Sequence, residues 1–565
     1  MENNRLLLFV ALAAVSFLLW DNWQRDYGPQ PAPTTSQVGQ STQMPLSGGE
    51  VPTASDVPSS PQASATSRDA SVPMAKSASA LKRGQRITVS TDLVYAEIDS
   101  IGGDLRLVDL KKYPISVKTP EKPIRLMDDT LPNVFVAQSG FAGKQSKSSQ
   151  VTTKSPNHYT NYKAERDSYT LAEGADNLNV DLKWTSPDGV TFTKRYAFKR
   201  GSYEVAVIYI IDNRSGKEWR GNSYYQMQHN NSTSIEESRF VYSYMGGVIY
   251  SPDKKYQKIS FGDMEDSNLN RDIKDGWAAM IQHYFVSAWI PETTNAFTYF
   301  TRTINQNERY VLGYKSVTEY SVAAGEKHSI SGRLFIGPKL QNKLEAIAPG
   351  LELTVDYGWL TLIAKPIFWL VDTIHSYVGN WGWSIILLTI LIKLAFYKLS
   401  ETSYKSMANM RRVQPRLVAM KERYGDDKQK MHQAMMELYK KEKINPLGGC
   451  LPIVVQIPVF IALYWVLLES VEMRQAPWIL WIQDMSRADP YFILPVIMGV
   501  TMLIQHKLNP TPVDPMQAKM MMILPLVFTV FFAFFPAGLV LYWVVNNTLS
   551  IAQQAYITKV VMAEK

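Results

Sequence analysis

The chain has 565 residues, more than one ordinary hydrophobic core organises, so we expect several domains. The net charge of +8 is modest, and the mean hydropathy of −0.15 resembles that of a soluble protein only because polar and apolar segments average out. The single cysteine, Cys450, excludes an internal disulfide, whichever compartment the domains occupy.

The N-terminus carries Arg5 followed by an apolar run from Leu6 to Trp20, which is either a signal peptide or a membrane anchor. Its small-residue patterns lie inside the run, whereas a cleavage site normally lies beyond it, so we favour an uncleaved transmembrane anchor over residues 1–24. Arg5 on the near side predicts a cytoplasmic N-terminus. Residues 25–85 are rich in Pro, Ser, Thr and Gln, which predicts a disordered tether.

Alternating apolar and polar residues begin at Arg86, in segments such as LNVDLKWTS and YEVAVIYIIDN. Turn sequences such as Pro187-Asp188-Gly189 separate these segments. Short strands joined by such turns predict an antiparallel β-sandwich over residues 86–345. Its histidines lack the spacing of metal ligands, so we expect structural or surface roles, with a sugar-binding or epimerase-like site left open: His158, His229, His283 and His328.

Long apolar runs make up the remaining third of the chain. Residues 346–379 mix Trp359 and Trp369 with charged residues, which predicts an interfacial amphipathic helix rather than a span. Residues 380–565 contain five better spans, each approaching the roughly 20 residues that cross a bilayer. They lie at about 380–401, 447–470, 490–507, 518–536 and 538–557. The sequence therefore predicts a multi-span α-helical membrane protein with a large external β-sandwich domain.

Basic residues give these spans a direction. The loop from Lys398 to Lys443 is rich in lysine and arginine, whereas the loop over residues 471–489 carries only Arg474 and Arg487. By the positive-inside rule the first loop is cytoplasmic and the second is external. The N-terminal anchor independently predicts the same orientation, with the β-sandwich outside.

Polar residues interrupt the predicted spans. Thr389, Lys393 and Tyr397 are spaced four residues apart and share one helix face. A lysine at the centre of a span costs roughly 2.5–3.5 kcal/mol on insertion scales. Lys393 either snorkels towards the headgroups or faces a hydrated groove inside the bundle. We favour the groove because no span supplies an acidic partner, and Gln456 in the next span adds a further polar group.

Residues 404–443 are predicted to form a cytoplasmic helical hairpin around Tyr424-Gly425-Asp426-Asp427. The hairpin either packs only on itself or captures substrates, because methionine adapts to varied apolar partners and basic residues meet lipid headgroups or ribosomal RNA. The candidate contact residues are Met407, Met410, Arg411, Arg412, Met435 and Met436.

The motifs of nucleotide hydrolysis and of proteolysis do not occur in the sequence. We therefore expect no enzymatic activity, no cofactor, no metal site and no DNA partner.

The run NPLGGCLPIVVQIPVFIALYWVLLESVEMRQAPWILWIQDMS, with DPYFILPVIMGVTM and FPAGLVLYWVVNN, closely resembles the YidC-type membrane protein insertases in their long Gram-negative form. The resemblance covers the whole chain. It implies a chaperone and insertase of the bacterial inner membrane that acts on nascent membrane proteins, alone or with the Sec translocon. It also implies a hydrophilic groove with one basic residue, here Lys393, where many members have an arginine whose planar fork binds carboxylates.

The resemblance further assigns substrate-path positions to Thr389, Phe460, Met498, Phe531 and Trp543, and a sugar-epimerase-like supersandwich without catalysis to the β domain. The phospholipid bilayer is an implied partner. The ribosome and the signal-recognition machinery are weaker candidates, because the chain ends at TKVVMAEK without the long basic tail of some members. Two alternatives are a transporter or channel and a membrane-anchored carbohydrate-binding module. The absence of an inverted repeat and of an intramembrane carboxylate argues against transport.

Overall fold

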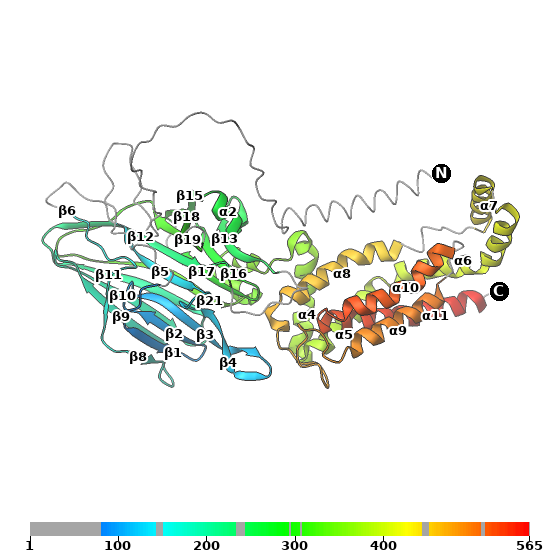
Figure 1. The fold of residues 1–565 in the computed structure, drawn as a ribbon, viewed down its shortest axis with the longest axis horizontal. Helices are drawn as coiled ribbons and strands as arrows, with labels where there is room; N and C mark the ends of the chain where they lie inside the picture. The colour runs from blue at the N-terminus through cyan, green and yellow to red at the C-terminus, as the bar shows by residue number, and fades with distance from the viewer. Residues whose placement is uncertain are drawn as a thin grey trace, which may run out of the picture. The chain divides into compact units, whose positions relative to one another are not determined.

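A computed structural model describes residues 81–142, 151–232, 243–292, 295–304, 308–425, 427–442, 451–509 and 515–563. The predicted anchor at residues 1–24 lies outside the described residues, as does the predicted tether at residues 25–85 except for its end. Among the described residues, the chain forms β-strands up to Pro338 and helices from Gln341 onward, apart from the short helix α2 (Phe261–Asp266) (Figure 1).

The strands form two sheets whose pairing is mostly antiparallel. The twelve strands of the first sheet are β1 (Arg86–Ser90), β2 (Val94–Asp99), β3 (Asp104–Ser116), β4 (Thr119–Met127), β5 (Phe135–Ala142), β6 (Val151–Thr152), β8 (Ser168–Thr170), β12 (Glu218–His229), β15 (Asn270–Lys274), β18 (Ala296–Ile304), β19 (Arg309–Ser316) and β20 (Tyr320–Val322). The nine strands of the second sheet are β7 (Lys163–Ala164), β9 (Asn177–Thr185), β10 (Val190–Lys199), β11 (Glu204–Asn213), β13 (Met245–Ser251), β14 (Lys255–Ile259), β16 (Trp277–Gln282), β17 (Phe285–Pro291) and β21 (Lys327–Pro338).

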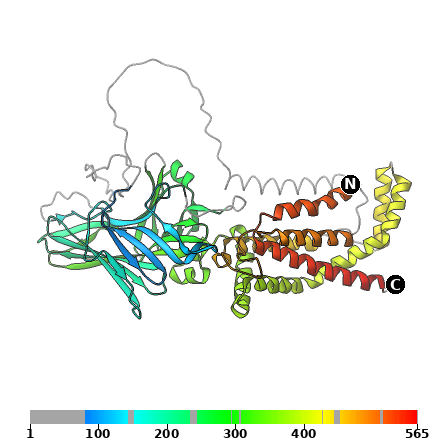
Figure 2. The same ribbon diagram turned by 60° about the horizontal axis from the view of Figure 1, so that its bottom comes forward.

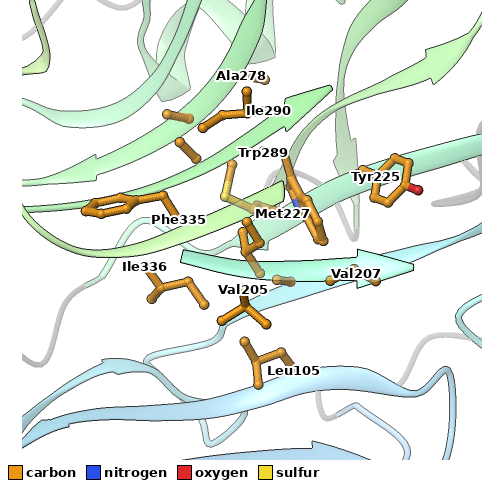
Figure 3. Packing of buried hydrophobic residues seen from close by; sticks show 14 of the residues in the cluster. Leu105, Val205, Val207, Tyr225, Met227, Ala278, Trp289, Ile290, Phe335 and Ile336 are labelled. Carbon is orange, nitrogen blue, oxygen red and sulfur yellow. The ribbon is translucent and has the colours of Figure 1, made fainter. Parts of the chain in front are cut away.

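The hydrophobic core lies between the two sheets. In β10 and β11 every second residue is buried, as the alternating sequence predicts for strands with one face on a core. Figure 3 shows Leu105 and Met227 from the first sheet packing with Val205, Trp289 and neighbouring side chains from the second. The Trp289 indole satisfies its buried Nε1–H by donating to the backbone oxygen of Gln226 at 3.0 Å. The predicted antiparallel β-sandwich is confirmed.

The helical part begins directly after β21. Its α-helices are α3 (Gln341–Ile347), α4 (Thr361–Val378), α5 (Trp381–Ala395), α6 (Tyr397–Tyr424), α7 (Lys428–Lys441), α8 (Leu451–Glu469), α9 (Ile493–Leu508), α10 (Pro515–Phe532) and α11 (Ala537–Ala563). Short 3-10 helices occupy Leu351–Thr354, Gly358–Leu360 and Val471–Met473. In Figure 2 the orange and red helices α9, α10 and α11 lie side by side, and α9 packs on both of the others.

Helix α4 is amphipathic. Ala364, Phe368 and Val371 are buried where it packs on α5 and α8, whereas Leu362 and Trp369 on the opposite face are exposed. This pattern is the one expected of a helix with one apolar face on protein and another on lipid or headgroups. Its position at a membrane interface stays a prediction.

The first predicted span, residues 380–401, is divided in the structure. Helix α5 ends at Ala395, and α6 continues at an angle of 68°. The break lies at Phe396, where the apolar run gives way to the charged sequence that begins at Lys398. The prediction of one span through residue 401 is therefore wrong at its end.

Taken one at a time, the helices of the described residues do not reach the length and hydropathy that a bilayer-crossing helix needs; α5 and α6 reach them as a bent pair. Three shorter apolar helical segments accompany this pair, at Val455–Glu469, Ile493–Leu508 and Lys519–Phe532.

The helical part exposes an extended apolar surface. Helix α10 alone presents many large apolar side chains: Met520, Met522, Ile523, Leu524, Leu526, Val527, Val530 and Phe531. Contiguous apolar surface of this kind is rare on soluble monomers and marks contact with lipid or protein.

A buried ion pair joins the end of β21 to the end of α8. Lys339 follows β21 directly, and its Nζ lies 3.1 Å from a carboxylate oxygen of Glu469. Both side chains are buried, and the ammonium also donates to the backbone oxygen of Thr354 at 3.1 Å. The second sheet is thereby bonded directly to a core helix.

The core packing predicts the response to truncation at Leu105. Leu105→Ala removes fully buried atoms of the sandwich core, so we expect a loss of about 2–5 kcal/mol in the free energy of opening of β3 and its neighbours. The measurement is amide hydrogen exchange of the full-length protein. Leu131→Ala, at a side chain that is 53% exposed, is the control and should change the same quantity by less than about 0.5 kcal/mol. Equal exchange in both variants would contradict the assignment of this core.

Candidate functional site

Lys393 lies on the buried face of α5, and its side chain reaches α11. The residue is 8% exposed, and its Nζ donates to Ser550 Oγ at 2.7 Å. Ser550 in turn donates its hydroxyl to the backbone oxygen of Asn546 at 2.7 Å. Thr389, one turn earlier on the same face, is also buried and donates to the backbone oxygen of Ile385 at 2.6 Å. The predicted shared face therefore holds for Thr389 and Lys393, which point into the helical bundle. It is wrong for Tyr397, which lies beyond the bend, at the start of α6.

The Lys393 ammonium has no carboxylate partner within the part of the chain that the structure describes. The buried carboxylate at the end of α8, Glu469, pairs with Lys339 instead. One hydroxyl satisfies one of the three ammonium protons, so two donors remain for water or for a bound substrate.

Helix α11 supplies a polar stripe opposite this lysine. Asn547, Ser550 and Gln554 are buried and recur at intervals of three and four residues, which places them on one helix face. The Asn547 amide donates to Thr501 Oγ1 of α9 at 3.3 Å, and the Gln554 amide donates to Asn509 Oδ1 at 3.0 Å. The polar interior thus lies between α5, α9 and α11.

An aromatic cluster adjoins the polar stripe. The rings of Phe460 on α8 and Trp543 on α11 meet edge to face with centroids 4.8 Å apart, and Phe532 of α10 lies 5.6 Å from Trp543. Phe531 is 51% exposed and contacts Phe535 at 4.7 Å. The Trp543 indole Nε1 is buried and has no hydrogen-bond partner among the described residues.

The structure brings some of the sequence-predicted residues together and separates others. Phe460 contacts Trp543, whereas Phe531 faces outward on α10 and Met498 is fully buried in α9. Gln456 is half-buried on α8. Sequence reasoning missed Ser550 and Gln554; their helical spacing from Asn547 is the signal that points to them.

The predicted hairpin residues form α6 and α7. Val413 and Leu417 are buried between these helices, with Met410 and Met435 packed against them. Met407 and Met436 are half-buried, and Arg411 and Arg412 are exposed. Packing within the hairpin therefore accounts for two of the predicted contact residues and leaves the other four available.

The histidines of the β-sandwich have structural partners. His158 Nδ1 lies 2.7 Å from the Tyr224 hydroxyl, and His229 Nε2 lies 2.6 Å from the Gln282 amide nitrogen. Burial lowers the pKa of His229 and of His283 to about 4, so both are neutral at physiological pH. Among the described residues, side chains that could ligate a metal do not gather in groups of three.

Comparison with known proteins places both parts of the chain. Residues 86–370 match the model of the YidC periplasmic domain, and residues 373–565 match that of the 60Kd inner membrane protein. A membrane protein insertase YidC from Thioalkalivibrio sulfidiphilus is 53% identical over 99% of this chain and 98% of the relative. One from Methylococcus capsulatus is 51% identical over the same shares.

A solved structure, described as an active YidC insertase with the first transmembrane domain resolved, aligns with 84% of this chain and 92% of its own at 16% identity. Its TM-score of 0.37 is too low to support a structural argument. The sequence matches, by contrast, extend through the β-sandwich and the helical part alike. This chain belongs to the YidC family of inner-membrane protein insertases.

Proposed function

We propose that this chain inserts and folds nascent integral membrane proteins in the bacterial inner membrane, through the polar interior between α5, α9 and α11. The observation that carries the proposal is the Lys393 ammonium, which is buried, bonded to Ser550 and without a carboxylate partner among the described residues. Intramembrane charges usually face the bundle interior or a water-filled cavity, where they interact with substrates or ions.

The direction of the Lys393 side chain supports the interior interpretation over snorkelling. A snorkelling lysine extends towards the headgroups at its own end of the helix. Here the amine crosses to the middle of α11 instead. In this role the amine hydrates the interior and attracts acidic residues of a translocating tail. Opposite charges 4 Å apart attract by about 1 kcal/mol in bulk water and about 4 kcal/mol at an effective dielectric constant of about 20.

The aromatic cluster and the outer face of α10 supply the apolar side of the path. A nascent transmembrane helix would pack on Phe460, Trp543 and the exposed apolar side chains of α10, while its polar tail crosses beside Lys393. The unpaired Trp543 Nε1–H would donate to a backbone carbonyl of the entering chain, since an unsatisfied donor is costly away from water.

The proposed topology has five core spans, a cytoplasmic N-terminus and an external β-sandwich. Its domains are the anchor at 1–24, the tether at 25–85, the β-sandwich at 86–345, the interfacial region at 346–379 and the core at 380–565. The concentration of basic residues between α5 and α8 supports this orientation. The Sec translocon is the proposed partner for larger substrates, and the chain itself carries out no enzymatic step.

Substitution of Lys393 tests the electrostatic role. Lys393→Ala should impair insertion of substrates with acidic tails most and neutral tails least, Lys393→Glu should be worst, and Lys393→Arg should retain function because it keeps the charge. The measurement is the protease accessibility of the translocated tail, in substrates whose tails differ in charge. All variants of the insertase are expressed at the same level. Lys398→Ala is the matched control, since it removes a lysine charge whose side chain is 90% exposed, and it should resemble the wild type. Equal insertion of acidic tails by the alanine variant and the wild type would refute the electrostatic role.

Crosslinking tests the substrate path. A photoreactive amino acid at position 460 or 543 should capture a stalled nascent membrane protein, because both side chains belong to the aromatic cluster. The same amino acid at position 362 on the exposed face of α4 is the control and should capture little of the nascent chain. Stronger capture at position 362 than at the two cluster positions would place the path elsewhere.

Charge reversal tests whether the cytoplasmic hairpin captures substrates. Arg411 and Arg412 are exposed, so the double variant R411E/R412E should slow insertion while α6 and α7 stay folded by circular dichroism. The double variant K440E/K441E, at exposed residues of the same hairpin, makes the same change in net charge and is the control. If both variants insert at the wild-type rate, the hairpin is only a packing element.

A further inference from the structure

The outer half of the β3–β4 hairpin extends beyond its sheet as a two-stranded ribbon. The pairing of β2 with β3 ends at Leu110, and the strand pairing of β3 with β5 is confined to Leu105. Beyond Leu110, β3 pairs with β4 alone, at an irregular register that includes Pro114 opposite Pro123. Figure 1 shows this ribbon in blue, projecting from the sheet. An isolated two-stranded ribbon is marginally stable in water, so this one needs a further support.

The support comes from the connection between α8 and α9. Arg474 Nη2 donates to the backbone oxygens of Pro114 at 2.7 Å and Ile115 at 3.1 Å, and Gln475 Nε2 donates to Pro114 at 2.9 Å. The Tyr113 ring meets Phe285 of β17 edge to face at 5.7 Å. Because Arg474 and Gln475 follow closely on the end of α8, the tip of the ribbon is held at the outer ends of the core helices.

The tip has the composition of a membrane-contacting surface. Ile115 is 47% exposed and Val117 is 41% exposed, although both are large apolar residues. Lys112, Lys118 and Lys122 flank them; these lysines are exposed and form no ion pair with other described residues. Glu121 is the one acidic residue between Lys111 and Lys122.

The connection between α8 and α9, which holds the tip, also exposes Leu480 and Tyr491.

We propose that residues 112–122, the tip of the β3–β4 hairpin, dock on anionic phospholipid headgroups of the outer leaflet of the inner membrane. Ile115 and Val117 enter the interfacial layer, and the lysines bind phosphate groups around them. This inference rests on the external position of the β-sandwich in the proposed topology and on no step of insertion.

The chemistry favours lipid over a protein partner. Lysines beside an anionic surface are attracted over a Debye length of about 8 Å at physiological salt, and their long stems let apolar neighbours reach the acyl boundary. The hairpin turns tightly between the paired residues Ser116 and Thr119, so exposed apolar side chains and lysines lie together at its end, as the layering of headgroups over acyl chains requires. Its backbone is already bonded to the external end of the membrane core, which limits its distance from the headgroups.

Depth-dependent fluorescence tests the proposal in the full-length chain. Cys450→Ser removes the one native cysteine, and Ile115→Cys then carries an environment-sensitive label in nanodiscs without substrate. With phosphatidylglycerol added to phosphatidylcholine, we expect a blue shift at position 115 and severalfold stronger quenching by brominated acyl chains than at the control position. The control is Leu131→Cys, whose apolar side chain is 53% exposed between β4 and β5.

A charge variant separates the two parts of the proposal. Replacing Lys112, Lys118 and Lys122 with glutamine should abolish the response to phosphatidylglycerol and leave the helical content unchanged. If the label at position 115 is quenched no more than the label at position 131 in every lipid mixture, the docking is overturned. Quenching that is independent of phosphatidylglycerol would overturn its electrostatic basis. A blue shift that is absent without substrate and appears only when a stalled nascent chain is added would overturn the docking and assign the tip to substrate. The readouts need no insertion activity, so failure of the proposed function leaves them interpretable.

Discussion

The helical part is organised around one constraint: a primary ammonium ion must be solvated inside a bundle whose outer surface is apolar. Transfer of an unpaired cation into a dry apolar medium is prohibitive, so the protein has to supply dipoles, water or both. The Ser550 hydroxyl accepts a hydrogen bond from the ammonium, and the buried amides of the same face of α11 make the surrounding surface polar rather than apolar. Ser550 requires α11 to pack closely on α5, because a dipole stabilises the cation best at hydrogen-bond distance, whereas Asn547 and Gln554 bond α11 to α9 and the residue that follows it.

The same constraint separates the two kinds of surface along α11. Towards α5 and α9 its side chains are polar and mutually bonded, and towards α8 and α10 they are aromatic. A nascent membrane protein has the same division, since its transmembrane segment is apolar and its translocated tail is polar. In the function proposed above, these two surfaces would match the two parts of the substrate in polarity.

Much of this organisation follows from local sequence patterns. Period-two alternation with turn residues predicts the sandwich, and the apolar runs predict the core helices. Each pattern depends only on which faces of one element are buried. The end of the apolar run before Lys398 marks where the straight helix stops, but the 68° angle of α6 depends on its packing against α11, which the pattern does not contain. Lys393 is conspicuous by its charge, whereas Ser550 is an ordinary helix residue that acquires its role from an amine 157 positions away. The outward position of Phe531 and the internal packing of Met410 and Met435 depend likewise on helix rotation, which composition does not specify.

The buried pair of Lys339 and Glu469 has a consequence for how this protein can change over evolutionary time. Loss of either partner alone leaves an isolated charge in a desolvated site, which costs about 3–5 kcal/mol. Replacement of both by well-packed apolar residues can be close to neutral. The two positions lie 130 residues apart, one after the last strand of the sandwich and one at the end of a core helix. Lineages should therefore keep both charges or lose both together, so that the β-sandwich and the insertase core are inherited as a matched set rather than exchanged as independent modules.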